Sequence, residues 1–205
     1  MESQLVVLAP IAVVWLAAGI VADGLPRLDR ARALRRRTGW LLALTLTGLG
    51  ATAAVLLTGL ASTGDTLADR AAAGVTLAAV PGIVVAVCAV RRAGRLRRGA
   101  QALATAPDTP APYGLRATAA HPLIVLPVQV TALATVPPLL ATVGVDLTAG
   151  PGRTGPAITV GALVVIAIGV RHALRHNRLA ERALPPALTL ATAPGSARPA
   201  GALHV

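Results

Sequence analysis

The chain of 205 residues is 55% hydrophobic and only 13% charged, and its mean hydropathy is +0.69. This composition excludes an ordinary soluble globular domain, in which about a quarter of the residues are charged. The net charge of +11 comes with almost no aromatic side chains, which argues against a nucleic-acid surface built on base stacking. We therefore expect membrane lipids, and no nucleic acid, as partners of these charges.

Five charge-free runs follow one another along the chain, at residues 3–22, 38–64, 71–90, 117–145 and 154–170. A helix needs about 20 residues, and at least about 17, to cross a hydrocarbon layer of roughly 30 Å. Backbone groups cannot stay unpaired in lipid, so each run is expected to be a helix. The sequence predicts an all-α, polytopic bundle, with a transmembrane domain over residues 1–182. Its spans are expected at about 4–22, 39–61, 71–90, 120–145 and 156–174.

The stretch RLDRARALRRRTGW, residues 27–40, lies shortly after the first apolar run and contains six arginines. A secretory signal peptide carries its positive charge before the apolar region, whereas this N-terminus reads MESQ, so we interpret the first run as a retained span. Residues 24–38, 91–121 and 171–205 hold 17 of the 19 arginines. The positive-inside rule then places the N-terminus outside and the C-terminus in the cytoplasm, with Trp40 beginning the second span at the interface.

Two of the basic segments also have a helical pattern. Ala93, Leu96, Ala100 and Leu103 share one face, opposite Arg91, Arg95 and Arg98. The tail carries a single stripe of four arginines at i, i+4, i+7 and i+11. We expect these faces to contact anionic lipid headgroups at the cytoplasmic side; the alternatives are an acidic protein partner or a solvated face that only sets topology. The candidate contacts are Arg35, Arg36, Arg37, Arg91, Arg95, Arg98, Arg171, Arg175, Arg178 and Arg182.

Residues 104–114 and 183–205 are rich in Pro, Ala and Thr and offer little large apolar surface to bury. Such composition is typical of disordered segments. The sequence therefore predicts a disordered cytoplasmic linker between the third and fourth spans and a disordered cytoplasmic tail over residues 183–205.

The fourth run, HPLIVLPVQVTALATVPPLLATVG, is the most irregular. Proline removes a backbone donor and kinks or breaks a helix, so Pro127, Pro137 and Pro138 are candidate kinks, as is Pro81 beside Gly82 in the third run. Interrupted helices form binding sites in secondary transporters. The sequence therefore suggests a polar path along the third and fourth spans, and kinks that serve packing alone are the alternative. The candidate path residues are Gln129, Thr131 and Thr135.

Small residues recur four positions apart in several runs, among them Gly50 with Ala54 and Ala78 with Gly82. Such rows let helix backbones approach closely. We expect them to pack helices within one molecule rather than between copies.

Few side chains are suited to catalysis or metal binding. The single cysteine, Cys88, is interpreted as a packing residue. His172 and His176 have the i, i+4 spacing of a metal-ligand pair, but neighbouring arginines disfavour a cation there. Asp23 and Asp146 follow spans and are expected at interfaces. We predict no catalytic residue, no metal and no cofactor.

With 19 arginines, no lysine and no phenylalanine, the chain has the bias of a GC-rich bacterial genome. The sequence predicts a multi-pass protein of the bacterial inner membrane that is not an enzyme. Its expected role is an accessory, assembly or scaffold subunit packed against a membrane-protein partner or a second copy. The alternative is a small oligomeric transporter or permease component. A third class, an intramembrane enzyme, requires a polar cluster assembled from distant residues, and a structure in which Asp23, Asp146 and the histidines are mutually remote would exclude it.

Overall fold

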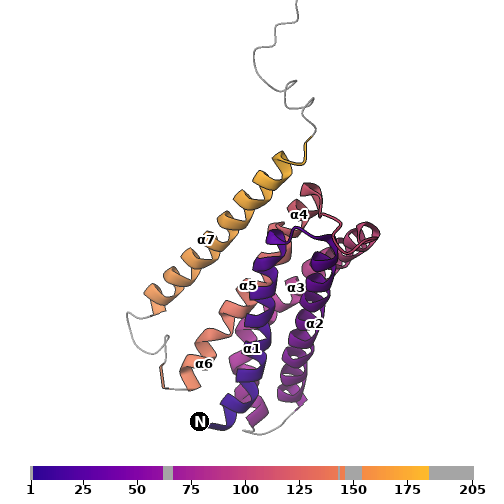
Figure 1. Cartoon of the computed structure of the whole chain (residues 1–205). Helices are drawn as coiled ribbons and strands as arrows, with labels where there is room; N and C mark the ends of the chain where they lie inside the picture. Colours follow the sequence, from indigo (N-terminus) through magenta and orange to yellow (C-terminus); the bar gives the residue numbers. More distant parts are fainter. Residues whose placement is uncertain (1, 62–66, 143, 146–153, 185–205) are drawn as a thin grey trace, which may run out of the picture.

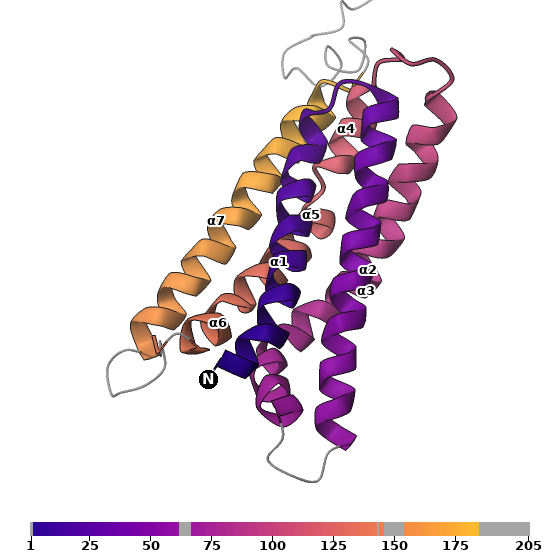
Figure 2. The ribbon, with the colours of Figure 1, turned by 60° about the horizontal axis from the view of Figure 1, so that its bottom comes forward.

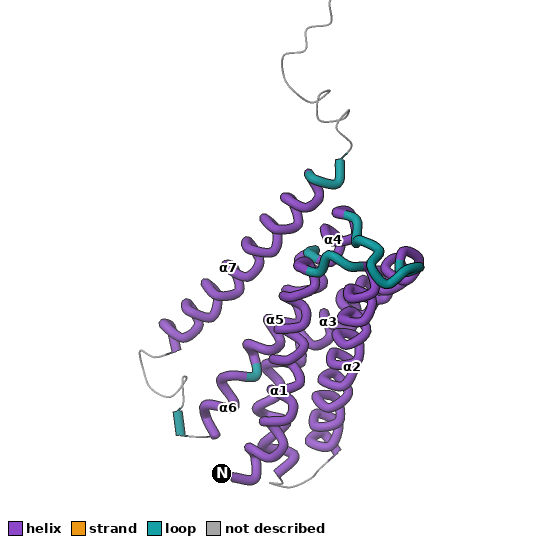
Figure 3. The backbone as a smooth tube through the Cα atoms, viewed as in Figure 1, coloured by secondary structure: helices purple, strands orange, loops and turns teal. Residues whose placement is uncertain are grey.

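The computed structural model describes residues 2–61, 67–142, 144–145 and 154–184 (Figure 1). Within this part of the chain every regular element is a helix, as Figure 3 shows, which confirms the predicted all-α class. A short 3₁₀ helix, η1 (Leu25–Arg27), follows the first α-helix. The α-helices are α1 (Glu2–Gly24), α2 (Ala31–Ala61), α3 (Leu67–Leu103), α4 (Tyr113–Ala119), α5 (Pro122–Ala134), α6 (Val136–Thr142) and α7 (Thr154–Glu181).

Four helical segments are long and apolar enough to cross a membrane, which makes this a multi-pass membrane protein. They are Leu5–Arg27, Ala31–Ala61, Tyr113–Ala141 and Thr159–Glu181. Each corresponds to one predicted span. The remaining predicted span, residues 71–90, lies inside α3 (Leu67–Leu103), which is not one of the four.

The main body consists of α1, α2, α3 and α5, with α2 packed along α3 and α5 packed against both α1 and α3 (Figure 2). Their contact surfaces form one continuous apolar core. Its largest fully buried side chains include Trp15, Leu34, Leu41, Leu96 and Ile124. α7 contacts this body mainly through α4 and α5.

Trp15 of α1 packs directly against Gly48 of α2. A Cβ added at Gly48 would lie 2.9 Å from Cε2 of Trp15, so only glycine leaves room for the indole ring. The Trp15 Nε1 donates a hydrogen bond of 3.2 Å to Oγ1 of Thr52. An added Cβ at Gly50 would meet nothing within 4 Å, so the close approach uses Gly48 and not the Gly50 row suggested by the sequence.

Three buried threonines lie seven residues apart on α2, at Thr38, Thr45 and Thr52. Each hydroxyl donates to a carbonyl four residues earlier, at 2.6 Å, 2.8 Å and 2.8 Å respectively. Because the helix itself satisfies these donors, the threonines are buried without an unpaired polar group.

The arginine-rich segments meet at one end of the bundle. The end of α1, the start of α2, the end of α3, α4 and the end of α7 all lie at this end, opposite the N-terminus (Figure 1). Arginine-rich and arginine-poor connections alternate along the chain, and in the folded molecule the arginine-rich ones lie together at one end.

The predicted linker at residues 104–114 is not disordered. The backbone N–H of Ala111 donates to Asp29 O at 2.6 Å, and the N–H of Ala31 donates to Thr109 O at 3.0 Å. Ala111 is buried, and α4 begins at Tyr113. These backbone hydrogen bonds hold the loop against residues 29–31, and the Pro-rich composition of the loop does not indicate them. Most of the predicted tail, residues 185–205, lies outside the described residues.

α2 starts nine residues before Trp40, at Ala31, so Trp40 does not begin the helix as expected. The arginines at 32, 35, 36 and 37 lie within its first two turns. Arg, Ala and Leu are strong helix formers, and they extend the helix out of the apolar run. The Trp40 side chain is 56% exposed.

Prolines divide the predicted fourth span at one place only. α5 ends at Ala134 and α6 begins at Val136, so Pro137 and Pro138 occupy the first turn of α6, where the missing N–H is tolerated. Pro127 lies inside α5, and Pro81 lies inside α3. The interruption expected at Pro81 is therefore not a break in the helix, because helices in membranes accommodate single prolines.

Candidate functional site

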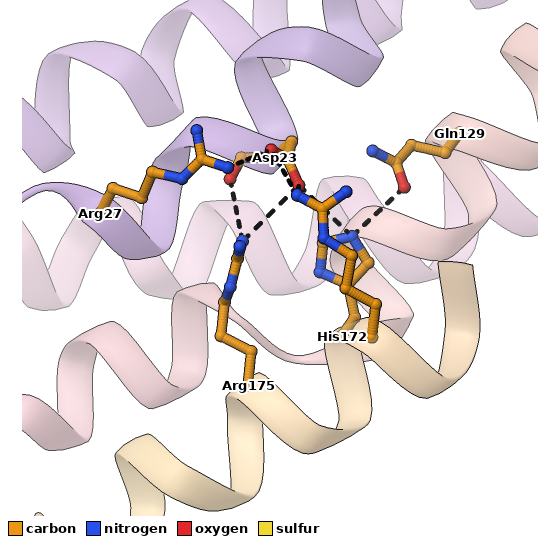
Figure 4. A network of polar contacts seen from close by, with 6 residues as sticks. Asp23, Arg27, Gln129, His172 and Arg175 are labelled. Atoms are coloured by element: carbon orange, nitrogen blue, oxygen red, sulfur yellow. Dashed lines mark hydrogen bonds and ion pairs between the residues drawn. The ribbon is translucent and has the colours of Figure 1, made fainter. Parts of the chain in front are cut away.

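A cluster of charged side chains joins α1 to α7 at the arginine-rich end of the bundle (Figure 4). Asp23 lies in the last turn of α1, and its Oδ2 accepts hydrogen bonds from Arg27 Nη2 at 3.0 Å and from Arg171 Nη2 at 3.1 Å. The same Arg171 nitrogen lies 2.9 Å from Oδ1. Arg175 Nη1 lies 3.6 Å from the same Oδ1 and donates to the Asp23 carbonyl at 3.3 Å. One carboxylate therefore connects two helices that are far apart in the sequence.

The Asp23 cluster carries an excess of positive charge, because three guanidinium groups surround a single carboxylate. Asp23 is largely buried, with 19% of its side chain exposed, whereas Arg27 and Arg171 are 62% and 52% exposed. The arginines thus reach the surface while their counter-charge lies beneath them. Such an arrangement leaves guanidinium donors available to an external anion.

His172 extends the cluster into the bundle. Its side chain is fully buried, and Nε2 lies 3.2 Å from Oε1 of Gln129 on α5 and 3.7 Å from Oδ1 of Asp23. An imidazole with its proton on Nε2 donates to the glutamine oxygen. Nδ1 of His172 has no hydrogen-bond partner among the described residues. Figure 4 shows His172 between Asp23 and Gln129, so three helices meet at this side chain.

A cavity of about 600 Å³ opens beside the cluster, between α1, α5, α6 and α7. Its polar lining consists of Asp23, Arg27, Arg37, Gln129 and Arg171. Leu16 and Ile20 of α1 belong to its apolar lining. The cavity therefore combines a polar end with walls suited to lipid or to an apolar ligand.

The other histidines have different partners. Nδ1 of His176 lies 2.7 Å from the carbonyl of Ala117 on α4, and its ring centroid is 4.9 Å from that of His121. His121 caps α5, accepting the Leu123 N–H on Nδ1 at 3.2 Å. In the described part of the chain, no three His, Cys, Asp or Glu side chains are grouped as a metal site requires.

The three candidate path residues do not line one path. Gln129 faces His172 and the cavity beside α7. Thr131 and Thr135 are buried, and their hydroxyls donate to Pro127 O at 2.8 Å and Ala132 O at 2.6 Å. Of the three, only Gln129 borders that cavity, which lies along α1, α5 and α7 rather than between α3 and α5.

The candidate lipid contacts divide into two groups. Arg171 and Arg175 belong to the Asp23 cluster, and the other eight candidates, on α2, on α3 and at or directly after the end of α7, are exposed. On α3, Ala93, Leu96 and Ala100 are buried opposite the arginines, which confirms the amphipathic pattern. Leu103 departs from it, with 37% of its surface exposed.

Sequence reasoning missed the Asp23 cluster. It placed Asp23 at an interface without a partner, and it gave no role to Arg27 or to His172 as a link between helices. The visible signal was an acidic residue directly after the first span, but its partner Arg171 lies 148 residues away. Oδ1 of Asp23 and Nε2 of His172 lie 3.7 Å apart, so these two residues are not remote from each other and do not exclude an intramembrane enzyme. Asp146 lies outside the described residues.

No family model matches the chain, and no curated protein or solved structure shows significant similarity to it.

Proposed function

We propose that this chain is a non-catalytic, multi-pass protein of the bacterial inner membrane, acting as an accessory or scaffold subunit that packs against a partner in the bilayer. Polar side chains within the spans support this role, because they tie helices of the same molecule together. Trp15 bonds Thr52 between α1 and α2, and Gln129 meets His172 between α5 and α7.

The proposed topology has five spans, with the N-terminus outside and the arginine-rich end in the cytoplasm. The gathering of the basic segments at one end of the bundle supports it, since arginines are retained on the cytoplasmic side of membranes. The fifth span in this scheme is α3, whose 37 residues are more than sufficient in length.

One observation carries the subunit role: α7 is the least covered of the four apolar spans. Only 6% of its most apolar window is buried, against 22–39% in the other three. The Asp23 cluster holds the arginine-rich end of α7, while large apolar side chains such as Val160 and Val164 remain exposed further down the helix. A helix fixed at one end and uncovered along its length offers a surface to a transmembrane partner.

A photo-activated cross-linker at Val160, compared with the same group at Leu46, tests this role. Both side chains are exposed, at 60% and 52%, but Leu46 lies on α2 within the main body. We expect Val160 alone to give one adduct, with a different protein that also co-purifies at fixed stoichiometry in native mass spectrometry. An adduct at twice the chain mass would show that the partner is a second copy of this chain. Equal adducts from both positions, or none, would refute the proposal.

A second candidate, a small transporter or permease component, is favoured by the cavity beside α7. Its polar end contains Gln129 and Asp23, and its apolar walls lie along α1 and α5. Gln129→Leu separates the two functions. In a transporter the variant loses flux while remaining folded; in a subunit it changes assembly or has no effect. A flux assay in proteoliposomes, alongside gel filtration of the variant, distinguishes these results.

A further inference from the structure

A long groove runs along α7 on the side facing η1 and α4. Its volume is about 1040 Å³, at the upper end of the range for ligand sites and far larger than a single phosphate ion needs. Its walls combine charged and apolar side chains. The arginines that line it are Arg27, Arg116, Arg171, Arg175, Arg178 and Arg182.

The two kinds of side chain are unevenly distributed along the groove, with apolar side chains toward one end and arginines toward the other. On α7 the apolar wall runs from Leu163 to Leu174, which is about 16 Å of helix at 1.5 Å per residue. This length equals roughly the hydrocarbon depth of one leaflet, about 15 Å. The arginines on and directly after α7 begin at Arg171, overlap the apolar wall as far as Leu174 and continue to Arg182, with Leu179 among them. The groove thus has an acyl-chain region below and a headgroup region above.

The headgroup region has more cations than the protein neutralises. Arg27, Arg171 and Arg175 share Asp23, and Arg116 pairs with Asp29 at 2.8 Å. Arg178 and Arg182 form no ion pair within the part of the chain that the structure describes, and both are exposed. Arg178 lies in the last turn of α7 and Arg182 directly follows the helix, with its N–H donating to Arg178 O at 3.4 Å, so their guanidinium groups can converge on one phosphate, which arginine binds in bidentate fashion.

We propose that this groove is a specific site for one anionic glycerophospholipid of the arginine-side leaflet. Arg178 and Arg182 hold the phosphate, with Arg175 beside them. An acyl chain lies along Leu163, Ile166, Val170 and Leu174. The site goes beyond the proposed subunit role and does not depend on it, because the lipid contacts only this chain.

The charge and the length of the groove favour a lipid over other anions. A free phosphate uses the arginines but leaves the apolar wall uncovered. An acidic soluble peptide would have to lie against an apolar wall at membrane depth. Only an amphipathic anion matches both halves, since basic pockets between helices at the membrane surface are suited to anionic headgroups.

The test is native mass spectrometry of the full chain in mild detergent, titrated with phosphatidylglycerol or phosphatidylcholine of identical acyl chains. We expect a 1:1 phosphatidylglycerol complex, at least about tenfold tighter than the phosphatidylcholine complex. Arg178→Ala with Arg182→Ala should abolish this preference. The matched control is Arg95→Ala with Arg98→Ala, which removes the same charge from the exposed face of α3 and should keep it.

Three results would overturn the proposal. Equal binding of the two lipids would show a groove without headgroup recognition, and equal loss in the two double variants would show attraction by net charge alone. Displacement of the lipid by millimolar inorganic phosphate would identify a free-anion site. An unchanged melting temperature establishes that the groove variant is folded. In addition, Leu174→Ser should weaken phosphatidylglycerol binding without creating phosphate binding, which tests the apolar wall separately.

Discussion

Asp23 and Arg171 are 148 residues apart, and their side chains meet at 2.9 Å between the end of α1 and the middle of α7. Around this contact, Arg27 and Arg175 approach the same carboxylate and His172 links it to Gln129. The contact holds the least covered span to the main body. α7 is thus held by the Asp23 cluster as well as by its packing on α4 and α5.

Asp23→Asn keeps the shape of the side chain and removes the charge that neutralises three arginines. We expect the free energy of unfolding to fall by about 1–2 kcal/mol, less than for a fully buried ion pair because Arg171 is 52% exposed. The loss should concentrate in α7, measured by unfolding in mixed micelles together with cysteine accessibility along that helix. The control is Asp108→Asn, which removes an 80% exposed partner of Arg30 and should change stability by less than about 1 kcal/mol. Equal effects would mean that the cluster does not hold α7.

Gly48 and Gly50 form a matched pair on α2. Gly48→Ala places a methyl group 2.9 Å from the Trp15 ring, and we expect a loss of about 1–3 kcal/mol through overpacking. Gly50→Ala meets nothing within 4 Å and should be neutral, or stabilising by up to about 1 kcal/mol, because alanine is the better helix former. Thermal unfolding followed by circular dichroism measures both. A destabilising Gly50→Ala with a silent Gly48→Ala would contradict the packing of α1 on α2.

The elements that sequence reasoning predicted well are those fixed by local physics. Apolar length determines a membrane helix, and the alternation of arginines with Ala93, Leu96 and Ala100 determines which face of α3 is buried. The threonines on α2 satisfy their own donors within one turn. These features need no knowledge of any other helix.

The features that escaped prediction depend on contacts between distant segments. Gly48 is distinguished from Gly50 only by the presence of Trp15 on another helix. The loop before α4 is ordered by backbone bonds to residues 29–31, which leave no trace in its Pro-rich composition. Asp23 was visible as an unusual residue after the first span, but its partners on α7 were not. The composition of a segment indicates its own structural preferences, whereas the roles of Gly48, of this loop and of Asp23 depend on contacts with other segments.

Trp15 and Thr52 should be energetically coupled. Trp15→Phe removes the indole N–H, and Thr52→Val removes its acceptor while keeping the shape. In a double-mutant cycle we expect a coupling of about 0.5–1 kcal/mol, the range for hydrogen bonds between membrane helices. Thr45 provides the control, since its hydroxyl donates only to the carbonyls of Leu41 and Leu42. Trp15→Phe and Thr45→Val should therefore add within about 0.5 kcal/mol, and a similar coupling in both cycles would refute the direct bond.

Cysteine labelling tests the proposed topology, including whether α3 crosses the membrane. In a Cys88→Ser background, single cysteines replace Ser62, which precedes α3 outside the described residues, and Gln101, which is exposed near the end of α3. If α3 is the fifth span, a membrane-impermeant maleimide should label position 62 in intact cells and position 101 only after permeabilisation. The physical reason is that the six arginines within 91–121 hold the second end of α3 in the cytoplasm.

Each alternative gives a distinct labelling pattern. Labelling of both positions from the same side would mean that α3 does not cross, and the number of spans would fall to the four apolar segments. Opposite sides in the reverse order would keep five spans but place the arginine-rich end outside. Leu41→Cys, at a fully buried position, should stay unlabelled throughout and shows that the bundle remains folded. The two sites thus test the number of spans and their orientation in one experiment.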